Sequence, residues 1–118
     1  MRYEIYLAPE AVEDLSRLPP HVRASVKSAI ETPLRHTPTA TSKSRIKRLR
    51  RETRPQYRLR VGDVRVFYDV TDDSVEVVAI VPKSGAAEWL ERAGEWDEEG
   101  AVARGQERSV AAAPSSKE

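Results

Sequence analysis

The chain has 118 residues, 39% hydrophobic and 33% charged, so it can bury one modest core and we expect a single domain. No apolar run approaches the roughly 20 residues of a membrane span or the apolar stretch of a signal peptide, so we expect a cytoplasmic protein without a membrane partner. The net charge is only +1. The lack of cysteine excludes disulfides and thiolate metal sites, and two histidines leave little for a zinc centre. We expect no metal site and no small-molecule cofactor.

The N-terminal third is predicted to form one strand and two helices. Arg2–Leu7 alternates apolar and polar side chains, which is typical of a strand. Pro9 suits the first turn of a helix that ends before the proline pair at 19–20. Apolar residues at helical spacing predict a second helix from Pro20 to about Glu31. Two short helices joined in this way form a helical hairpin.

The middle of the chain is predicted to be β-structure. After a polar loop over 37–44, Ile46 and Leu49 belong either to a short strand or to a docking segment. Three strands joined by tight turns at 62–63 and 71–74 follow; they are Gln56–Val61, Val64–Val70 and Val75–Val81. We therefore expect an α+β fold, with the helical hairpin packed on an antiparallel sheet.

The C-terminal part is predicted to be a short helix and a tail. Ala86–Ala93 reads as the last helix, with Ser84 as a candidate N-cap. Beyond it the composition is rich in alanine, glycine, serine and glutamate without an apolar period. We expect one domain over residues 1–93 and an acidic, flexible and disordered tail over 94–118.

Charge is distributed unevenly along the chain. Between Thr41 and Arg65 there are ten basic residues and two acidic ones, whereas residues 86–118 hold eight acidic and four basic ones. Such a basic block favours a polyanionic partner, nucleic acid above all. The alternative is a solvated charged face beside a solubilising tail.

The turn at Gly62–Asp63 predicts the pairing of its two flanking strands, because glycine supplies the positive φ that a two-residue turn needs. Side chains alternate between the faces of a strand, so apolar and basic residues separate. The face under the helices is expected to hold Tyr57, Leu59, Val61, Val64, Val66 and Tyr68. The opposite face is expected to hold Arg58, Arg60, Arg65, Phe67 and Asp69.

The arginine face has two interpretations. It is either a hydrated sheet surface whose arginine stems cover Phe67, or an anion site, because guanidinium groups are forked donors matched to phosphate oxygens. Asp69 and Glu76 are expected to lie close enough to offset part of the repulsion between Arg60 and Arg65. In both cases Arg65 is expected to be exposed, so its replacement by alanine should cost about 0.5 kcal/mol or less.

Other candidate residues carry weaker signals. Lys83 either points into the same basic region or is a solvated lysine at a strand end. His21 and His36 have no partner at a recognisable spacing and are interpreted as surface residues. The two tyrosines of the hairpin are interpreted as packing residues. Trp89 is expected to dock on the domain, and Trp96 either docks or serves a partner.

Three segments of the chain resemble the RelE/ParE superfamily of bacterial toxins. They are Lys47–Leu49, the run Tyr57–Tyr68 with the pattern Tyr-Arg-x-Arg-x-Gly-Asp-x-Arg-x-x-Tyr, and Val77–Val81. The resemblance covers roughly residues 1–92. It implies two helices packed on a curved antiparallel sheet, and a cognate antitoxin as partner. RelE members are endoribonucleases that cut mRNA on the ribosome without a metal, whereas ParE members poison DNA gyrase.

The resemblance also implies roles for individual residues. Arg58 and Arg65 match basic residues of the RelE active face, and Arg60 matches a further basic position. Lys83 stands near the place where RelE proteins usually have an arginine after the last strand. These proteins often have a catalytic tyrosine near the C-terminus, but no tyrosine follows Tyr68 in this chain.

The leading hypothesis is a RelE-like mRNA interferase that inhibits translation. Arg58, Arg65 and Lys83 would be catalytic, and Lys47, Arg48 and Arg60 would bind RNA, with mRNA and the ribosome as partners. The first alternative is a ParE-like toxin, or a degenerate member that binds antitoxin or nucleic acid without cutting. The second alternative is a small nucleic-acid-binding domain outside this superfamily.

Overall fold

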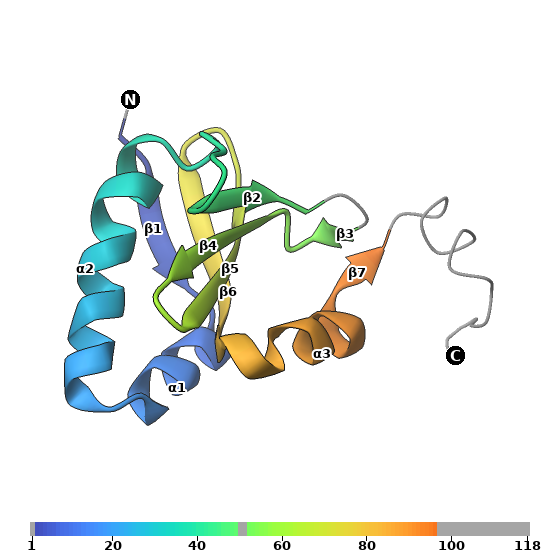
Figure 1. The fold of residues 1–118 in the computed structure, drawn as a ribbon. Helices are drawn as coiled ribbons and strands as arrows, with labels where there is room; N and C mark the ends of the chain where they lie inside the picture. The colour runs from blue at the N-terminus through green and yellow to red at the C-terminus, as the bar shows by residue number, and fades with distance from the viewer. Residues whose placement is uncertain (1, 50–51, 97–118) are drawn as a thin grey trace.

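The computed structural model describes residues 2–49 and 52–96, which form an α+β domain as expected (Figure 1). In chain order the elements are β1 (Glu4–Leu7), α1 (Pro9–Arg17), α2 (Pro20–His36), β2 (Ile46–Arg48), β3 (Glu52–Arg54), β4 (Tyr57–Val61), β5 (Val64–Val70), β6 (Ser74–Pro82), α3 (Lys83–Ala93) and β7 (Glu95–Trp96). A five-stranded sheet has the order β1-β6-β5-β4-β2, and β3 pairs with β7 in a separate ribbon. Helices α1 and α2 cover one face of the large sheet, and α3 packs on the other.

The sheet is mixed rather than wholly antiparallel. Strand β1 runs parallel to β6, with Glu4 opposite Ser74 and Leu7 opposite Val77. All other pairs in the large sheet are antiparallel. After β1, the chain crosses one face of the sheet as α1 and α2. The neighbour of β1 in the sheet is β6, the last long strand, and it runs in the same direction as β1.

Two helix boundaries differ from the sequence prediction. Helix α2 continues past Glu31 and through Pro33 to His36, because Leu34 in its last turn is fully buried in the core. Helix α3 begins at Lys83, directly after Pro82, so the prediction that Ser84 caps a helix starting near Ala86 is wrong. The first backbone N–H of α3 instead donates to the carbonyl of Asp63, at 2.7 Å.

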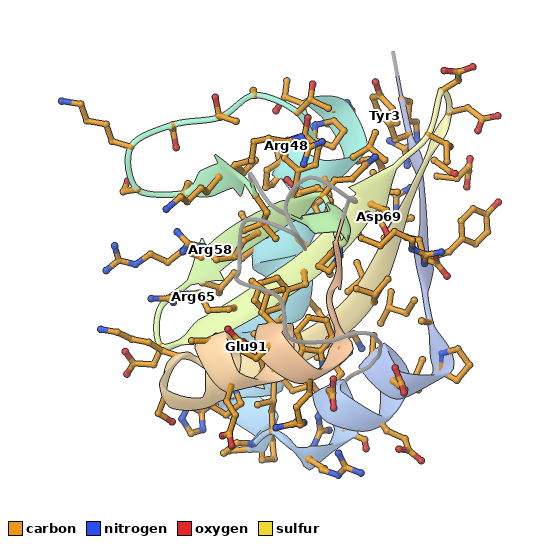
Figure 2. All side chains as sticks on the ribbon, turned by 90° about the vertical axis from the view of Figure 1, so that its right-hand side faces the viewer. Tyr3, Arg48, Arg58, Arg65, Asp69 and Glu91 are labelled. Carbon is orange, nitrogen blue, oxygen red and sulfur yellow. The ribbon has the colours of Figure 1, made fainter. Side chains whose placement is uncertain are left out.

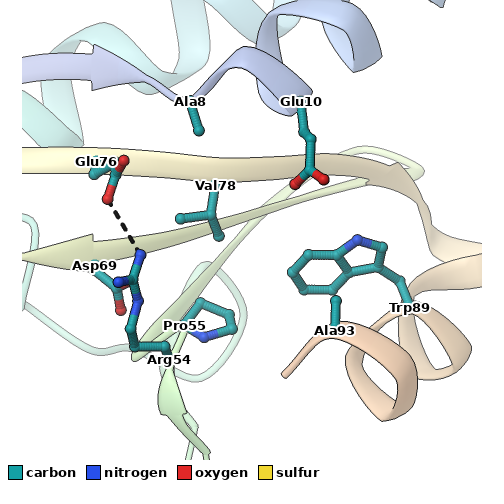
Figure 3. Close-up of a pocket in the computed structure, with 9 residues that line it drawn as sticks. All are labelled: Ala8, Glu10, Arg54, Pro55, Asp69, Glu76, Val78, Trp89 and Ala93. Carbon is teal, nitrogen blue, oxygen red and sulfur yellow. Dashed lines mark hydrogen bonds and ion pairs between the residues drawn. The ribbon is translucent and has the colours of Figure 1, made fainter. Parts of the chain in front are cut away.

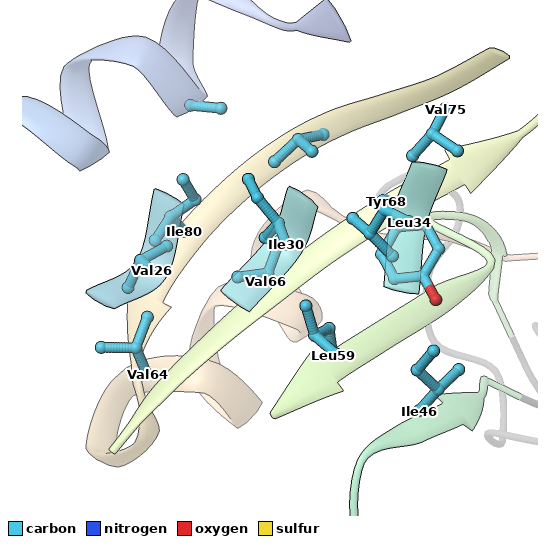
Figure 4. Packing of buried hydrophobic residues seen from close by; sticks show 12 residues of the cluster. Val26, Ile30, Leu34, Ile46, Leu59, Val64, Val66, Tyr68, Val75 and Ile80 are labelled. Carbon is cyan, nitrogen blue, oxygen red and sulfur yellow. The ribbon is translucent and has the colours of Figure 1, made fainter. Parts of the chain in front are cut away.

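The main core lies between the helical hairpin and the sheet (Figure 4). The predicted hairpin register is confirmed, since Val61 pairs with Val64 and Leu59 with Val66. The predicted core face is confirmed too, and these side chains pack against Val26, Ile30 and Leu34 of α2. Burial of this apolar face holds the strands in a single register, because a slip of one residue would expose every side chain on it.

A second, smaller cluster lies on the opposite face under α3. Phe67 is 1% exposed and packs with Leu49 and Ala79, and its ring stacks on Trp89 with 4.8 Å between ring centroids. Trp89 therefore docks as predicted. The face that also carries the arginines is not an open sheet surface, because α3 covers part of it. Both interpretations of Ile46 and Leu49 hold, since Ile46 begins β2 and Leu49 docks beneath α3.

The end of the described chain pairs with the ribbon strand β3. Trp96 lies opposite Glu52 and Glu95 opposite Arg54, so these two residues of the expected tail are in β-structure. The remainder of that tail, residues 97–118, lies outside the described residues. Within the described part of the chain, no helix is both long and apolar enough to cross a membrane.

Candidate nucleic-acid interface

Cross-strand pairing gathers basic side chains on the α3 side of the sheet. Lys47 of β2 lies opposite Arg58 of β4, and Arg58 lies opposite Phe67 of β5. In the next row of the same face, Arg60 lies opposite Arg65. We call Lys47, Arg58, Arg60 and Arg65 the basic face. Figure 2 shows Arg58 and Arg65 beside one another above α3.

Arg58 occupies the centre of the basic face and is partly buried. Its Nε is buried and has no hydrogen-bond partner among the described residues. Burial, and then the positive charges of Arg65 and Arg60, lower the pKa of Arg58 below its ordinary value. A donor that is buried, unpaired and surrounded by like charge is costly, and an anion bound there would remove that cost.

Arg65 is buried, with 8% of its surface exposed, which contradicts the expectation that it lies open to solvent. Its Nη1 donates to the carbonyls of Gly62 at 2.9 Å and of Val64 at 3.1 Å. The physical reason is that its cross-strand neighbour Val81 packs in the cluster beneath α3, so the helix covers this part of the sheet. Arg65 thus stabilises the hairpin turn through these two hydrogen bonds, and its positive charge acts on Arg58.

Lys83 and Arg60 are the exposed members of the predicted set near the hairpin tip. Lys83 is the first residue of α3, and its backbone N–H contacts the carbonyl of Asp63 in the turn. Arg60 donates its backbone N–H to the carbonyl of Arg45 in the segment that precedes β2. The structure therefore brings Lys83 to the same end of the hairpin as Arg60 and Arg65.

Arg48 does not join the basic face. It follows Lys47 in β2, so its side chain leaves from the opposite face of the strand. Its Nη1 donates to the carbonyls of Leu49 and Gln56, at 2.8 and 2.9 Å. Its guanidinium lies over the Tyr57 ring, 5.3 Å from the centroid. The structure thus separates two residues that the sequence analysis placed together as RNA-binding.

Neither the two tyrosines of the hairpin nor the two histidines lie on the basic face. Tyr57 and Tyr68 stack on one another on the helical side of the sheet. The Tyr68 hydroxyl donates to the carbonyl of Pro38 at 2.7 Å, and burial raises the pKa of Tyr68. His21 and His36 belong to α2, which covers the same helical side. The basic face thus presents guanidinium and ammonium groups, which can bind an anion and stabilise negative charge.

A second charged cluster, which sequence reasoning missed, lies where the same sheet face approaches β1. Arg54 contacts Asp69 at 3.1 Å and Glu76 at 3.3 Å, and Asp69 also accepts the backbone N–H of Gln56 at 2.8 Å. Burial raises the pKa of Asp69, against the opposing effect of these donors. Asp69 and Glu76 are thus bonded to Arg54, and the expectation that they offset the Arg60–Arg65 pair is wrong.

These three charged residues border a pocket of about 240 Å³ (Figure 3). Glu10 of α1 lines it from one side, and Trp89 and Ala93 of α3 line it from another. The sequence feature that could have revealed the Arg54 cluster is its acidic pair, because Asp69 and Glu76 are cross-strand partners and need a cation beside them. Among the described residues, no group of three or more acidic or histidine side chains is arranged to hold a metal ion.

Comparison with known proteins adds independent information. The model of the family described as ParE toxin of type II toxin–antitoxin system, parDE, matches residues 5–86. The RelBE2 toxin–antitoxin complex of Mycobacterium tuberculosis contains a chain 26% identical, with a TM-score of 0.59 over 70% of this chain and 99% of that one. A chain of the RelB–RelE complex of Methanococcus jannaschii is 24% identical, with a TM-score of 0.56 over 72% and 98%.

A chain of the E. coli DinJ–YafQ toxin–antitoxin complex has the same fold at 14% identity, with a TM-score of 0.57 over 74% of this chain and 97% of that one. No curated protein matches the chain significantly.

Proposed function

This chain belongs to the family of ParE toxins of type II toxin–antitoxin systems, within the RelE/ParE superfamily, and we propose that it acts as a RelE-like endoribonuclease on ribosome-bound mRNA. The interpretation as a binding domain outside this superfamily is therefore excluded. The observation that carries the proposal is Arg58, a half-buried guanidinium with an unpaired donor at the centre of a basic face.

Each residue of the basic face, and Lys83 beside it, has its own role in the proposed activity. Arg58 would bind a backbone phosphate through its free donor, with Lys47 and Arg60 contacting the neighbouring phosphates. Arg65 would hold the hairpin turn and supply charge from below, and Lys83 would approach from the start of α3. Contacts of this kind to phosphate are strong, because an arginine stays charged and donates through a rigid fork.

The proposed reaction is a metal-free transesterification. The ribose 2′-oxygen attacks the adjacent phosphorus, the bond to the 5′-oxygen breaks, and the products are a 2′,3′-cyclic phosphate and a 5′-hydroxyl. The proton of the 2′-hydroxyl passes to water, since the hairpin tyrosines and the histidines, all among the described residues, lie away from the basic face, and the leaving oxygen gains a proton from water. Arg58 would stabilise the additional negative charge that develops on the phosphate oxygens.

We also propose a cognate antitoxin as partner, in the cytoplasm where the mRNA target is found. The solved complexes of similar fold each pair a toxin with an antitoxin, which supports this proposal. Such an antitoxin would place acidic side chains against Arg58 and its neighbours, because a charged site is neutralised most directly by opposite charge.

A ParE-like action on DNA gyrase is the second candidate. Two observations favour it: the matching family model is that of ParE toxins, and the basic face has no described tyrosine or histidine beside it. In this alternative the same arginines would contact the target without breaking a phosphodiester bond.

One experiment separates the two candidates. Purified protein is added to ribosomes carrying a defined mRNA and, separately, to gyrase with supercoiled DNA. We expect mRNA cleavage by the wild type and a loss of about 100-fold or more in Arg58→Ala, as is typical when a donor to a developing oxyanion is removed. Arg17→Ala, which removes an exposed arginine of α1, is the matched control and should cut normally.

The other outcomes each contradict the proposal in a different way. Cleaved DNA trapped on gyrase, with intact mRNA, would favour the ParE-like action. Full cleavage by a folded Arg58→Ala would show that the reaction does not use this face. Inactivity of the wild type in both assays would refute both candidate activities.

A further inference from the structure

The pocket beside Arg54 lies on the same sheet face as Arg58, further from the hairpin turn. Asp69 follows Phe67 by two residues in β5, and Phe67 is the cross-strand neighbour of Arg58. With about 3.3 Å per residue along a strand and about 4.8 Å between strands, the Cα atoms of Arg58 and Asp69 lie about 8 Å apart. Glu76, the partner of Asp69 in β6, lies one strand further. One nucleotide extends over this distance from its phosphate to the edge of its base.

The two ends of this span differ in chemistry. Arg58 has a buried Nε without a hydrogen-bond partner among the described residues, which suits an anion. Arg54, at the pocket, is already bonded to the carboxylates of Asp69 and Glu76, so this arginine is not free for a second phosphate. The pocket suits an uncharged group with polar edges. A nucleotide carries a charged phosphate and an uncharged base, and the face offers a place for each.

The pocket also has an aromatic wall (Figure 3). The indole of Trp89 lines it, and the stacking of this ring on Phe67 holds it in position. The volume of about 240 Å³ is below the roughly 300–1,000 Å³ of pockets that take drug-sized ligands, so a flat ring system fits better than a whole nucleotide. Proteins bind unpaired bases by packing them against aromatic side chains and by hydrogen bonds at their edges.

The polar groups of the pocket determine which bases it accepts. Asp69 accepts the backbone N–H of Gln56 at 2.8 Å and the Nε of Arg54 at 3.1 Å, so its orientation is fixed. Glu76 accepts from Arg54 through Oε1, and within the described part of the chain its Oε2 has no hydrogen bond. An ionised carboxylate only accepts, so Oε2 requires a donor from the ligand. The exocyclic amines of adenine, cytosine and guanine are such donors, whereas uracil has no exocyclic amine.

We infer that this pocket binds a nucleobase with an exocyclic amine, which donates to Glu76 while its ring packs against Trp89. The inference deepens the proposed function and rests on it for the phosphate at Arg58. The pocket then selects the base beside the bound phosphate and disfavours uracil.

Fluorescence of Trp89 tests the pocket without ribosomes. The full-length chain has two tryptophans, so the variant Trp96→Phe leaves Trp89 as the single reporter. The probes are adenosine 5′-monophosphate and purine riboside 5′-monophosphate, which differ only in the exocyclic amine. We expect both to quench Trp89 and the first to bind about tenfold more tightly, because its amine bonds to a carboxylate. Ribose 5-phosphate, which has no base, should leave the fluorescence unchanged.

Three further variants in this background locate the two ends of the nucleotide. Glu76→Ala should reduce the tenfold ratio to less than about threefold. Glu88→Ala is the matched control and should keep the ratio, because Glu88 of α3 pairs with Arg92 as Glu76 pairs with Arg54. Arg58→Ala should weaken both nucleotides by the same factor, because it removes a contact to the phosphate that they share. Circular dichroism checks that each variant is folded.

The outcomes separate this inference from the proposed function. Equal binding of the two nucleotides, or a ratio that Glu76→Ala leaves intact, would overturn the base pocket, while weaker binding by Arg58→Ala would still support the phosphate site. A ratio that depends on Glu76, with no effect of Arg58→Ala, would support the pocket and count against the proposed role of Arg58.

The remaining outcomes concern other ligands of the pocket. No response of Trp89 to adenosine 5′-monophosphate up to about 10 mM would overturn the inference, since even a weak specific site gives a Kd near this range. Quenching by N-acetyl-lysine methylamide in place of the nucleotides would also overturn it, because the pocket would then take a basic side chain of a protein.

Discussion

Replacement of Arg65 by alanine tests whether this residue stabilises the fold or serves only to bind a ligand. The side chain is 8% exposed, and its Nη1 bridges the carbonyls of Gly62 and Val64 across the hairpin turn. Arg60, its cross-strand partner, is exposed and serves as the control. The two variants remove the same group from neighbouring sites, so any difference between them reports the burial and the two hydrogen bonds of Arg65.

The expected loss follows from a few contributions. A hydrogen bond from a charged donor contributes about 1.5–3 kcal/mol, and the Gly62 carbonyl recovers part of this by bonding to water. The buried stem adds up to about 0.8 kcal/mol per methylene, while relief of repulsion from Arg60 returns up to about 1 kcal/mol. We expect Arg65→Ala to lower the free energy of unfolding by about 2 kcal/mol, and Arg60→Ala by no more than about 0.5 kcal/mol.

Urea denaturation followed by circular dichroism measures both values. With a slope of about 1–3 kcal/mol per molar urea, Arg65→Ala should shift the midpoint down by about 1 M. Arg65→Lys should recover part of the loss, because it keeps the stem and the charge but not the planar fork. Equal midpoints for Arg65→Ala and Arg60→Ala would refute the structural role of Arg65.

Three further predictions concern the packing and the titrating groups. Tyr68→Phe leaves a buried carbonyl without its donor and should cost about 1–2 kcal/mol at pH 7, against little for Tyr57→Phe. Because burial raises the pKa of Tyr68, its contribution is full below about pH 10 and declines above it, so unfolding at pH 7 and 10.5 should show a smaller difference at the higher pH. Trp89→Ala uncovers Phe67 and should cost about 3 kcal/mol, with increased binding of a hydrophobic dye. Burial also raises the pKa of Asp69, so the stability of the wild type relative to Asp69→Asn should fall as pH rises from about 4, measured by denaturation from pH 3 to 7.

The parts of the fold that sequence reasoning predicted correctly are those decided by local rules. The turn at Gly62 has the positive φ, 57°, that the hairpin requires, and alternation then places each neighbouring side chain on its face. The end of α2 was missed because a local rule stops helices near proline, whereas burial of Leu34 carries the helix through Pro33. The pairing of β3 with β7 was missed because each strand is too short to show a period and its partner is distant in the sequence.

The sequence predicts where the candidate site lies, but it does not predict which of the site's residues are buried. Alternation alone places Arg58 and Arg65 on one face, yet the burial of Arg65 depends on where α3 lands on the sheet. The separation of Lys47 from Arg48 follows from the same alternation, once Ile46–Arg48 is known to be a strand. The pairing of β2 with β4 shows that this segment is a strand, whereas the sequence allowed either a strand or a docking segment.

The basic block of the sequence overstates the charge that is available to a ligand. Arg54 belongs to that block, but Asp69 and Glu76 neutralise it at the other end of the same sheet face. None of the ion pairs among the described residues involves Arg58, which lies between like charges instead. The two ends of one sheet face therefore differ in whether their arginines already have carboxylate partners. A bound anion is stabilised most beside an arginine that has no carboxylate partner within the protein. We therefore expect phosphate to bind at the hairpin end of the face.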